Sequence, residues 1–389
     1  MAHDRWFSSE TVDIEELRRT TSTDGVDAPT SAVIECGVPI YDAADLSIGP
    51  SHEPLPTADR RLLGELASVL ADGPGILVVK RAVETAVVDA TTESFLSMIE
   101  AERDSDRGSG DHFAAEGSND RVWNAMEKLA IGWPEIFAEY YSAPVVDVVS
   151  RAWLGPGYQI TSQVNVVKPG GKAQAPHRDY HLGFMSDAEA EHYPAHVHRL
   201  SPSLTLQGAV AHDPMPLETG PTTYLPHSQK FGPGYVAWRR DDVRSFYEEH
   251  HVQLPLEKGD AVFFNPALLH GAGTNRTQDR RRMANLLQVS SPFGRAMEAM
   301  NRRAMCRAVT PVLMDWKAGG RSSEEIARVI AAVAEGYSFP SDLDTDQRTE
   351  GLAPPSQAAL LHAAIETGKD LHELDAALDA KARAQGLAG

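Results

Sequence analysis

Cysteine is scarce in this chain: Cys36 and Cys306 are the only two among 389 residues. They lie far apart in the sequence, and neither belongs to a CxxC pair. A disulfide framework needs several paired cysteines, and a thiolate zinc site needs at least two that lie close together, so the sequence excludes both. We expect both residues to be small apolar members of the interior.

Long apolar runs are also missing. The longest runs, such as GILVV at residues 75–79, fall far short of the about 20 apolar residues that a transmembrane helix needs. The first residues, MAHDRWFSSETVDIEELRR, have no apolar segment behind a basic start, so we expect no secretory signal. The sequence therefore predicts a cytoplasmic protein without a membrane partner.

Positive charge is outweighed by negative charge. The chain has 36 Lys and Arg against 55 Asp and Glu, which gives a formal net charge of −19 and a pI of about 5.2. An acidic surface repels phosphate backbones, so we expect no nucleic acid as a partner. Hydrophobic residues make up 42% of the chain and charged residues 23%, which is typical of a globular protein. Nothing in the composition indicates the oligomeric state.

The residue patterns divide the chain into three parts. Residues 1–55 are rich in Ser, Thr, Asp and Pro, and we expect an extended arm there. Residues 56–300 begin with helical patterns and continue, from about residue 157, with short alternating runs separated by Gly, Pro and Asn, which favour a β sandwich or barrel. Residues 301–389 return to helix-forming sequence. The prediction is a mixed fold, a β core flanked by N- and C-terminal helices.

A polar stretch interrupts the first helical region at residues 104–124. Loops of this length inside a compact domain are usually functional or disordered. We expect this one to be a lid that closes over an active site, and a plain surface loop is the alternative.

A first cluster of metal-ligand residues lies in QAPHRDYHLGF at 174–184. His177 and Asp179 are two residues apart, so on a strand both side chains point to the same side. In NPALLHGAG at 265–273, His270 follows the strand-like run AVFF. Two histidines and one carboxylate form the facial triad of non-haem iron(II) oxygenases. A zinc hydrolase can use the same ligands with water in the open position, so ligand type alone leaves the metal open.

Arginines follow His270 closely. On a strand, Arg281 shares a face with Met283, Asn285 and Leu287. An arginine that points inward near a metal needs an anion, and a guanidinium binds a carboxylate through two parallel hydrogen bonds. We predict that Arg281 binds the distal carboxylate of 2-oxoglutarate. Four arginines follow His270: Arg276, Arg280, Arg281 and Arg282. The alternative is that all four are solvated surface charges.

Three segments together resemble the phytanoyl-CoA dioxygenase family: HRDYH at 177–181, ETGPTTYLPHSQK at 218–230 and LLHGAGTNRTQDRRR at 268–282. Members of this family are iron(II)- and 2-oxoglutarate-dependent oxygenases with a double-stranded β-helix, a jelly-roll fold of the cupin type. Their arginine for the co-substrate stands eleven residues after the distal histidine, which here is Arg281. The resemblance is clearest over residues 157–295 and weaker over 57–155.

The resemblance implies roles for individual residues. His177, Asp179 and His270 are expected to hold Fe(II), Arg281 to anchor 2-oxoglutarate, and O2 to be the second co-substrate. Because related halogenases replace the carboxylate of the triad by a small residue, Asp179 favours hydroxylation or another oxidation over halogenation.

Further residues are expected around the co-substrate. Gln163 and Asn165 share one face of the strand before the HxD motif, and Thr222 follows the Gly-Pro turn; each is alternatively an ordinary sheet residue. Arg178 stands where glutamine is common in the family, and we expect it to alter the mouth of the pocket.

The sequence thus predicts a dioxygenase that hydroxylates a small molecule at an unactivated C–H bond and releases succinate and CO2. One alternative is a metal-dependent hydrolase or isomerase with the same His/Asp/His set. Another is a non-catalytic binding module that kept the fold. The substrate stays open, although the net charge of −19 gives no support for an acyl-CoA with its phosphates.

Overall fold

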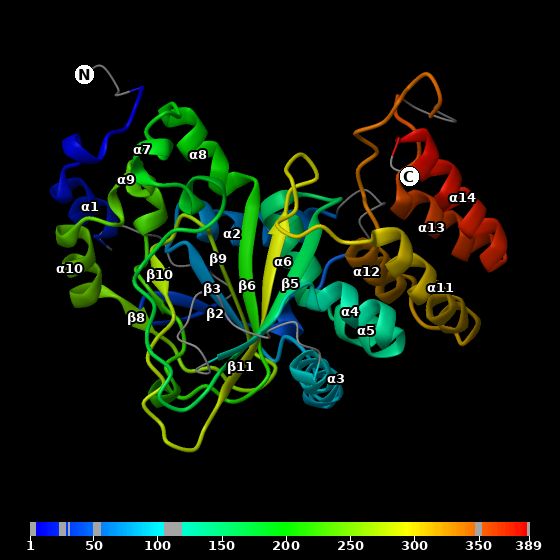
Figure 1. Cartoon of the computed structure of the whole chain (residues 1–389), viewed down its shortest axis with the longest axis horizontal. Coiled ribbons are helices and arrows are strands. Elements are labelled where there is room, and N and C mark those ends of the chain that lie inside the picture. Colours follow the sequence, from blue (N-terminus) through cyan, green and yellow to red (C-terminus); the bar gives the residue numbers. More distant parts are fainter. Residues whose placement is uncertain are drawn as a thin grey trace.

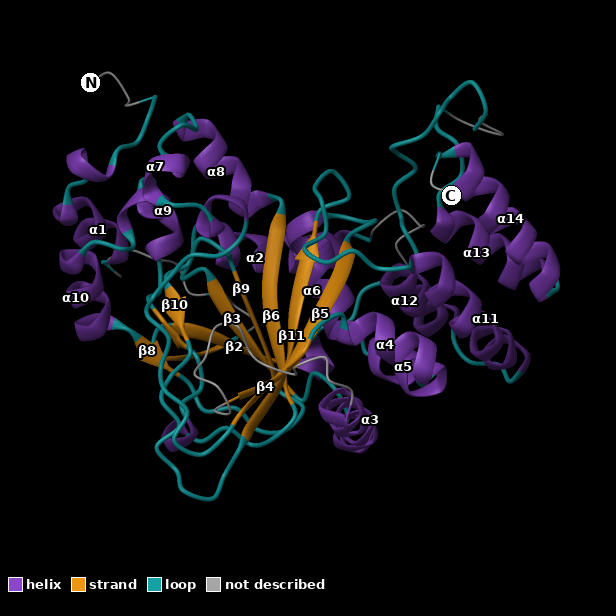
Figure 2. Ribbon diagram, viewed as in Figure 1, coloured by secondary structure: helices purple, strands orange, loops and turns teal. Residues whose placement is uncertain are grey.

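Two β-sheets of unequal size face one another in this chain (Figures 1 and 2). The computed structural model describes residues 5–22, 29, 32–49, 56–104, 119–346 and 352–386. The larger sheet has eight strands in the order β1 (Val33–Glu35), β2 (Val38–Asp42), β3 (Ile76–Lys80), β9 (Ala261–Phe264), β6 (Thr205–Ala211), β11 (Arg282–Ser290), β5 (Gln159–Val167) and β4 (Asn119–Val122). The smaller sheet has the order β10 (His270–Gly271), β7 (Thr223–Tyr224) and β8 (Val252–Gln253).

Helices flank the sheets on both sides (Figure 1): some cover the outer face of the larger sheet, and others lie on the side of the smaller sheet. Those before the central strands are α1 (Ile14–Thr21), α2 (Thr57–Ala71), α3 (Thr85–Asp104), α4 (Ala125–Gly132), α5 (Pro134–Tyr141) and α6 (Pro144–Leu154). Those between the strands are α7 (Asp187–Ala190), α8 (Ala195–Ser203), α9 (Gly234–Ala237) and α10 (Asp241–His250). The C-terminal ones are α11 (Arg302–Ala318), α12 (Ser323–Val333), α13 (Gln357–Thr367) and α14 (Leu371–Ala384).

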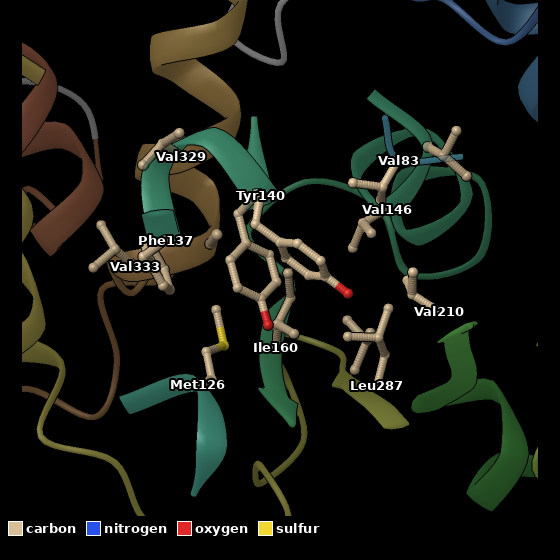
Figure 3. Packing of buried hydrophobic residues seen from close by; sticks show 14 of the residues in the cluster. Val83, Met126, Phe137, Tyr140, Val146, Ile160, Val210, Leu287, Val329 and Val333 are labelled. Carbon is tan, nitrogen blue, oxygen red and sulfur yellow. The ribbon is translucent and has the colours of Figure 1, made fainter. Parts of the chain in front are cut away.

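The alternation of side chains along the strands separates a packed face from a cavity face. On β11, Met283 and Leu287 belong to the large hydrophobic cluster under the helices. Tyr140 of α5 belongs to the same cluster as Ile160 of β5 and Leu287 (Figure 3). Burying each large apolar side chain of this kind contributes about 1.5–3 kcal/mol. The even-numbered residues of β11 point to the opposite face, toward the smaller sheet.

The predicted fold is confirmed: the two sheets form a double-stranded β-helix, and helices precede and follow it in the sequence. The helical pattern at 57–73 is α2, and the one at 84–104 is α3. The third stretch, 134–155, forms two helices because Pro144 starts a new helix after the turn at Ser142 and Ala143.

Part of the expected extended arm belongs to the larger sheet. Residues 33–42 form β1 and β2, and β2 pairs in parallel with β3. The side chains of Val38 and Tyr41 are buried, so this segment is packed rather than loose. Cys36, expected in the interior, is exposed in the turn between these strands, whereas Cys306 is buried.

The division of the chain at residues 55 and 300 stays a prediction. The apolar residues of α11 and α12 share one continuous hydrophobic cluster with the strands and with α4 and α5. The proposed lid at 104–124 falls largely on residues 105–118, which lie outside the described residues. No helix in the described part of the chain is both long and apolar enough to cross a membrane.

Candidate active site

A cavity of about 690 Å³ lies between the two sheets. Apolar side chains from the inner face of the larger sheet make much of its wall, among them Val262 and Phe264 of β9 and Ala284 and Leu286 of β11. All three residues predicted to bind a metal also line it. The cavity is therefore large enough for a small organic molecule beside a metal centre.

Backbone pairing brings the two halves of the metal site together. The N–H of His177 donates to the carbonyl of His270 at 2.9 Å, and the N–H of His270 donates to the carbonyl of His177 at 3.2 Å. Asp179 is held through its own N–H, which donates to the carbonyl of Pro266 at 3.2 Å. The chain then turns sharply at Tyr180, whose φ is 64°. Segments about 90 residues apart in sequence thus present their side chains to one point.

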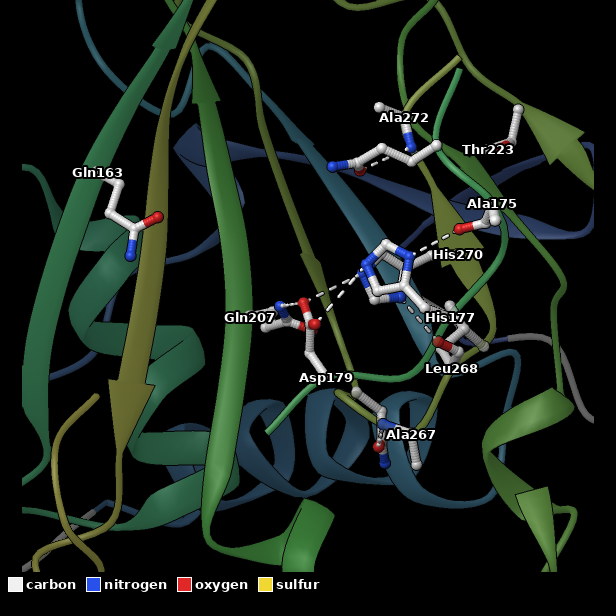
Figure 4. A network of polar contacts seen from close by, with 12 residues as sticks. Gln163, Ala175, His177, Asp179, Gln207, Thr223, Ala267, Leu268, His270 and Ala272 are labelled. Atoms are coloured by element: carbon white, nitrogen blue, oxygen red, sulfur yellow. Dashed lines mark hydrogen bonds and ion pairs between the residues drawn. The ribbon is translucent and has the colours of Figure 1, made fainter. Parts of the chain in front are cut away.

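The three side chains converge as metal ligands do (Figure 4). One candidate ligand atom from each of His177, Asp179 and His270 lies within 4.8 Å of the others. Nε2 of His177 is 3.6 Å from Oδ1 of Asp179, and Nε2 of His270 is 3.5 Å from Oδ2. No other group of three such residues was found in the described ranges.

Each imidazole is oriented by its second nitrogen. Nδ1 of His177 donates to the carbonyl of Ala175 at 2.9 Å, and Nδ1 of His270 donates to the carbonyl of Leu268 at 2.9 Å (Figure 4). Because a carbonyl only accepts, the proton sits on Nδ1 and leaves the Nε2 lone pair free for a metal. This is the usual way in which backbone carbonyls fix metal-binding histidines.

The protonation states also suit a metal. Burial, and the nearby His270, lower the pKa of His177, so its ring is neutral at neutral pH. Burial opposes ionisation of Asp179, but its electrostatic interactions with His270 and His177 and a hydrogen bond from Gln207 together lower its pKa. The neutral imidazole of His177 and the carboxylate of Asp179 therefore face the cavity beside the ring of His270.

Arg281 does not reach this cavity, and the prediction that it points inward is wrong. Its side chain is 40% exposed, and its Nε donates to Oδ2 of Asp213 at 3.1 Å. The parity argument grouped Arg281 correctly with Met283 and Leu287, but that face packs against the helices. Arg281 itself precedes β11 and stays at the surface.

Arg282 is the arginine that lines the cavity. It is 6% exposed, one of its terminal nitrogens has no hydrogen-bond partner, and no carboxylate of the described residues forms an ion pair with it. Burial lowers the pKa of Arg282 to about 10, so it stays charged at neutral pH. The buried hydroxyl of Tyr224 is close enough to Arg282 to influence this pKa. A buried cation without an anion is costly, which marks Arg282 as a binding group for an anionic ligand.

The other predicted pocket residues do line the cavity, namely Gln163, Asn165 and Thr222. Gln163 accepts a hydrogen bond from Nη1 of Arg121 at 2.8 Å, and Arg121 lies on β4 with its guanidinium over Trp123. Whether Gln163, Asn165 and Thr222 contact the co-substrate remains a prediction. For Gln163 and Asn165 of β5, the position on the cavity face follows from the strand alternation.

Arg178 is not a mouth residue. It is 2% exposed, and its Nη2 donates to the carbonyls of Ser228 at 2.5 Å and Phe231 at 3.0 Å. Its guanidinium also lies over the ring of Tyr235. Since Arg178 stands between His177 and Asp179 in sequence, it ties the metal-binding segment to the loop after β7.

Sequence reasoning missed three residues of the site: Gln207, Tyr224 and Trp238. Trp238 lies edge-on to His177, with 6.5 Å between ring centroids, and Tyr224 is stacked parallel to His270 at 6.5 Å. Gln207 alone left a usable signal, a glutamine in the largely apolar strand LTLQGAVA.

The donor set fits iron(II) well. Two imidazoles and a single carboxylate on one side of a pocket leave several coordination positions open, as in non-haem iron(II) oxygenases. A buried arginine in the same cavity suits the distal carboxylate of a 2-oxo acid. Fold and site together define the class of iron(II)- and 2-oxoglutarate-dependent oxygenases.

The family model "Phytanoyl-CoA dioxygenase (PhyH)" matches residues 71–283, which is more than half of the chain. The chain belongs to the phytanoyl-CoA dioxygenase family, whose members use iron(II) and 2-oxoglutarate. The match covers all three candidate metal ligands and Arg282.

Curated relatives match over shorter stretches. The peroxisomal phytanoyl-CoA dioxygenase of Mus musculus is 35% identical over 94 residues, covering 24% of this chain and 22% of the mouse protein. Dioxygenase trt7 of Aspergillus terreus is 26% identical over 177 residues, covering 44% of this chain and 56% of trt7. The multifunctional dioxygenase prhA of Penicillium brasilianum is 27% identical over 192 residues, covering 47% and 60%. The chain thus spans about a fifth of the mouse enzyme and somewhat over half of the fungal ones.

Solved structures show a weaker similarity. The α-ketoglutarate-dependent epimerase SnoN from nogalamycin biosynthesis has a TM-score of 0.42 and 18% identity, covering 61% of this chain and 84% of SnoN. The carbocyclase SnoK from the same biosynthesis has a TM-score of 0.42 and 19% identity, covering 63% and 87%. These values are too low to carry a conclusion about the reaction of this chain.

Proposed function

We propose that this chain is an iron(II)- and 2-oxoglutarate-dependent hydroxylase of a small, largely apolar molecule. The observation that carries the proposal is one cavity with two features: the converging His177, Asp179 and His270, and the buried, unpaired Arg282. A buried cation without a protein carboxylate favours an anionic ligand such as a 2-oxo acid beside the metal. The cytoplasmic location stays a prediction.

Each group has a definite task in this proposal. His177, Asp179 and His270 would hold the iron, and Arg282 would bind the distal carboxylate of 2-oxoglutarate. When bound, iron and 2-oxoglutarate would supply the oxidising chemistry, in which O2, 2-oxoglutarate and a substrate C–H bond give a C–OH group, succinate and CO2. The chain fixes the geometry: the carbonyls of Ala175 and Leu268 hold the rings in place.

The walls of the cavity suggest the substrate class. Away from the triad they are mainly apolar, with contributions from Met215, Leu254, Leu256 and Met297. Trp238 and Phe184 add aromatic surface, and Phe184 is 54% exposed although it lines the cavity. Such walls exclude water and bind hydrocarbon surface by burial. We therefore infer that the carbon to be oxidised belongs to an apolar part of the substrate.

The test is 2-oxoglutarate turnover with a panel of apolar small molecules. Purified protein with Fe(II) should convert 2-oxoglutarate to succinate, and an added substrate should give one oxygenated product per succinate, with one atom from ¹⁸O2. Asp179→Ala and His270→Ala should abolish both, because each removes a metal ligand. Product formation that continues without O2 would instead favour a metal-dependent hydrolase or isomerase.

A further inference from the structure

Gln207 makes the closest contact to the metal-binding carboxylate (Figure 4). Its Nε2 donates to Oδ2 of Asp179 at 2.5 Å, and the glutamine is only 5% exposed. It comes from β6 of the larger sheet, so its position does not depend on the loop that carries Asp179. Side chains from two separate backbone segments thus meet at one carboxylate oxygen.

The orientation of this amide is fixed by chemistry. An ionised carboxylate only accepts hydrogen bonds, so Gln207 must present its NH2 group to Asp179. Its Oε1 is then directed elsewhere, and this buried atom has no hydrogen-bond partner. A buried acceptor without a partner costs about 1–3 kcal/mol. The neighbours of Gln207 on the same strand face are alanines, Ala209 and Ala211, so an apolar residue would suit the packing better.

The two oxygens of Asp179 therefore differ. Oδ2 carries the hydrogen bond from Gln207, whereas Oδ1 lies 3.6 Å from Nε2 of His177 with no hydrogen-bond donor on it in the described part of the chain. A carboxylate that is free to rotate can bind a metal through both oxygens and take up an additional coordination position. One that is held through Oδ2 offers Oδ1.

We propose that Gln207 is a positioning residue that holds Asp179 so that one oxygen, Oδ1, binds the metal and the remaining positions stay open for the co-substrates. This inference rests on the proposed function, since it assumes that the triad binds a metal. Partners of this kind typically change metal affinity by about 10–100-fold when they are removed.

Gln288 provides a matched control. It lies directly opposite Gln207 in the register of β11 and β6, lines the same cavity and is 8% exposed. Its Oε1 is likewise buried without a partner, but none of the hydrogen bonds to Asp179 comes from it. Gln207→Leu and Gln288→Leu therefore remove the same group from neighbouring places, and only the first releases the carboxylate.

The experiment is a titration of the metal-free proteins with Mn(II), following free Mn(II) by electron paramagnetic resonance. Gln207→Leu should raise the Kd for Mn(II) about 10-fold or more, and Gln288→Leu should leave it within about 3-fold of the wild-type value. Gln207→Met, which keeps the unbranched shape, decides the question if Gln207→Leu does not fold.

A second readout follows the geometry itself. With Fe(II) and 2-oxoglutarate under anaerobic conditions, the visible absorption band of the wild-type protein should shift or weaken in Gln207→Met and stay in place in Gln288→Leu. Equal Mn(II) affinity and equal bands in all folded variants would overturn the role of Gln207. A wild-type protein that binds no Mn(II) would instead overturn the proposed function.

Discussion

Arg282, and not the predicted Arg281, lines the cavity, and this difference gives the sharpest prediction about the co-substrate. Replacing either arginine by methionine removes one guanidinium and keeps an unbranched apolar stem. Arg282 is 6% exposed in the cavity, whereas the side chain of Arg281 is 40% exposed and paired with Asp213 outside it. Only the Arg282→Met variant should lose 2-oxoglutarate.

The size of the loss follows from burial. Removing one partner of a buried, hydrogen-bonded charge pair costs about 2–5 kcal/mol, which corresponds to a Kd about 30-fold to several thousand-fold higher. The exposed pair of Arg281 with Asp213 contributes no more than about 1 kcal/mol to stability and nothing to the cavity. The assay is isothermal titration of the Mn(II)-loaded proteins with 2-oxoglutarate.

Stability should change in the opposite direction. Without 2-oxoglutarate, Arg282 is a buried cation without a carboxylate partner, so Arg282→Met should unfold at an equal or higher temperature than the wild type. If Arg281→Met abolishes 2-oxoglutarate binding while Arg282→Met binds normally, the side of β11 that faces the cavity has been assigned wrongly.

Three further predictions concern stability. Burial, and then the charge of Lys258, lower the pKa of His212 to about 3, so between pH about 6.5 and 5 only the unfolded chain takes up this proton. The free energy of unfolding of the wild type, measured in urea, should therefore fall as the pH drops from about 6.5 to 5. In His212→Gln this fall should be less steep, by up to about 1.4 kcal/mol per pH unit. Gly234→Ala would place a methyl group on the guanidinium of Arg178 and should cost about 1–3 kcal/mol, whereas Gly64→Ala, with open space around it in α2, should be neutral or stabilising in the same assay. Mn(II) at about 100 times its Kd should stabilise the wild type by about 2.7 kcal/mol in thermal unfolding and should leave His270→Ala unchanged.

The metal site was predictable because its signal is local and chemical. His177 and Asp179 are two residues apart, so strand geometry alone puts both on one side. His270 follows a buried strand and directly precedes a glycine-rich turn. The double-stranded β-helix was reached through the resemblance that these motifs carry, since the short alternating runs indicate only a sandwich or barrel.

The face of the last strand was not predictable in the same way. Alternation shows that Arg281 and Arg282 point in opposite directions, but both faces of β11 are largely buried, one under helices and one around the cavity. Burial patterns therefore cannot distinguish the two faces in the sequence. Gln207 was missed for a related reason, because its partner Asp179 is 28 residues away and only the paired sheets bring them together.

We propose above all that one cavity holds iron through the triad and 2-oxoglutarate through Arg282. The most direct measurement is the visible spectrum of the anaerobic Fe(II) protein after addition of 2-oxoglutarate. We expect a weak charge-transfer band in the wild type, and none in Arg282→Met at the same 2-oxoglutarate concentration. A wild-type protein that binds Fe(II) but shows no band at saturating 2-oxoglutarate would contradict it.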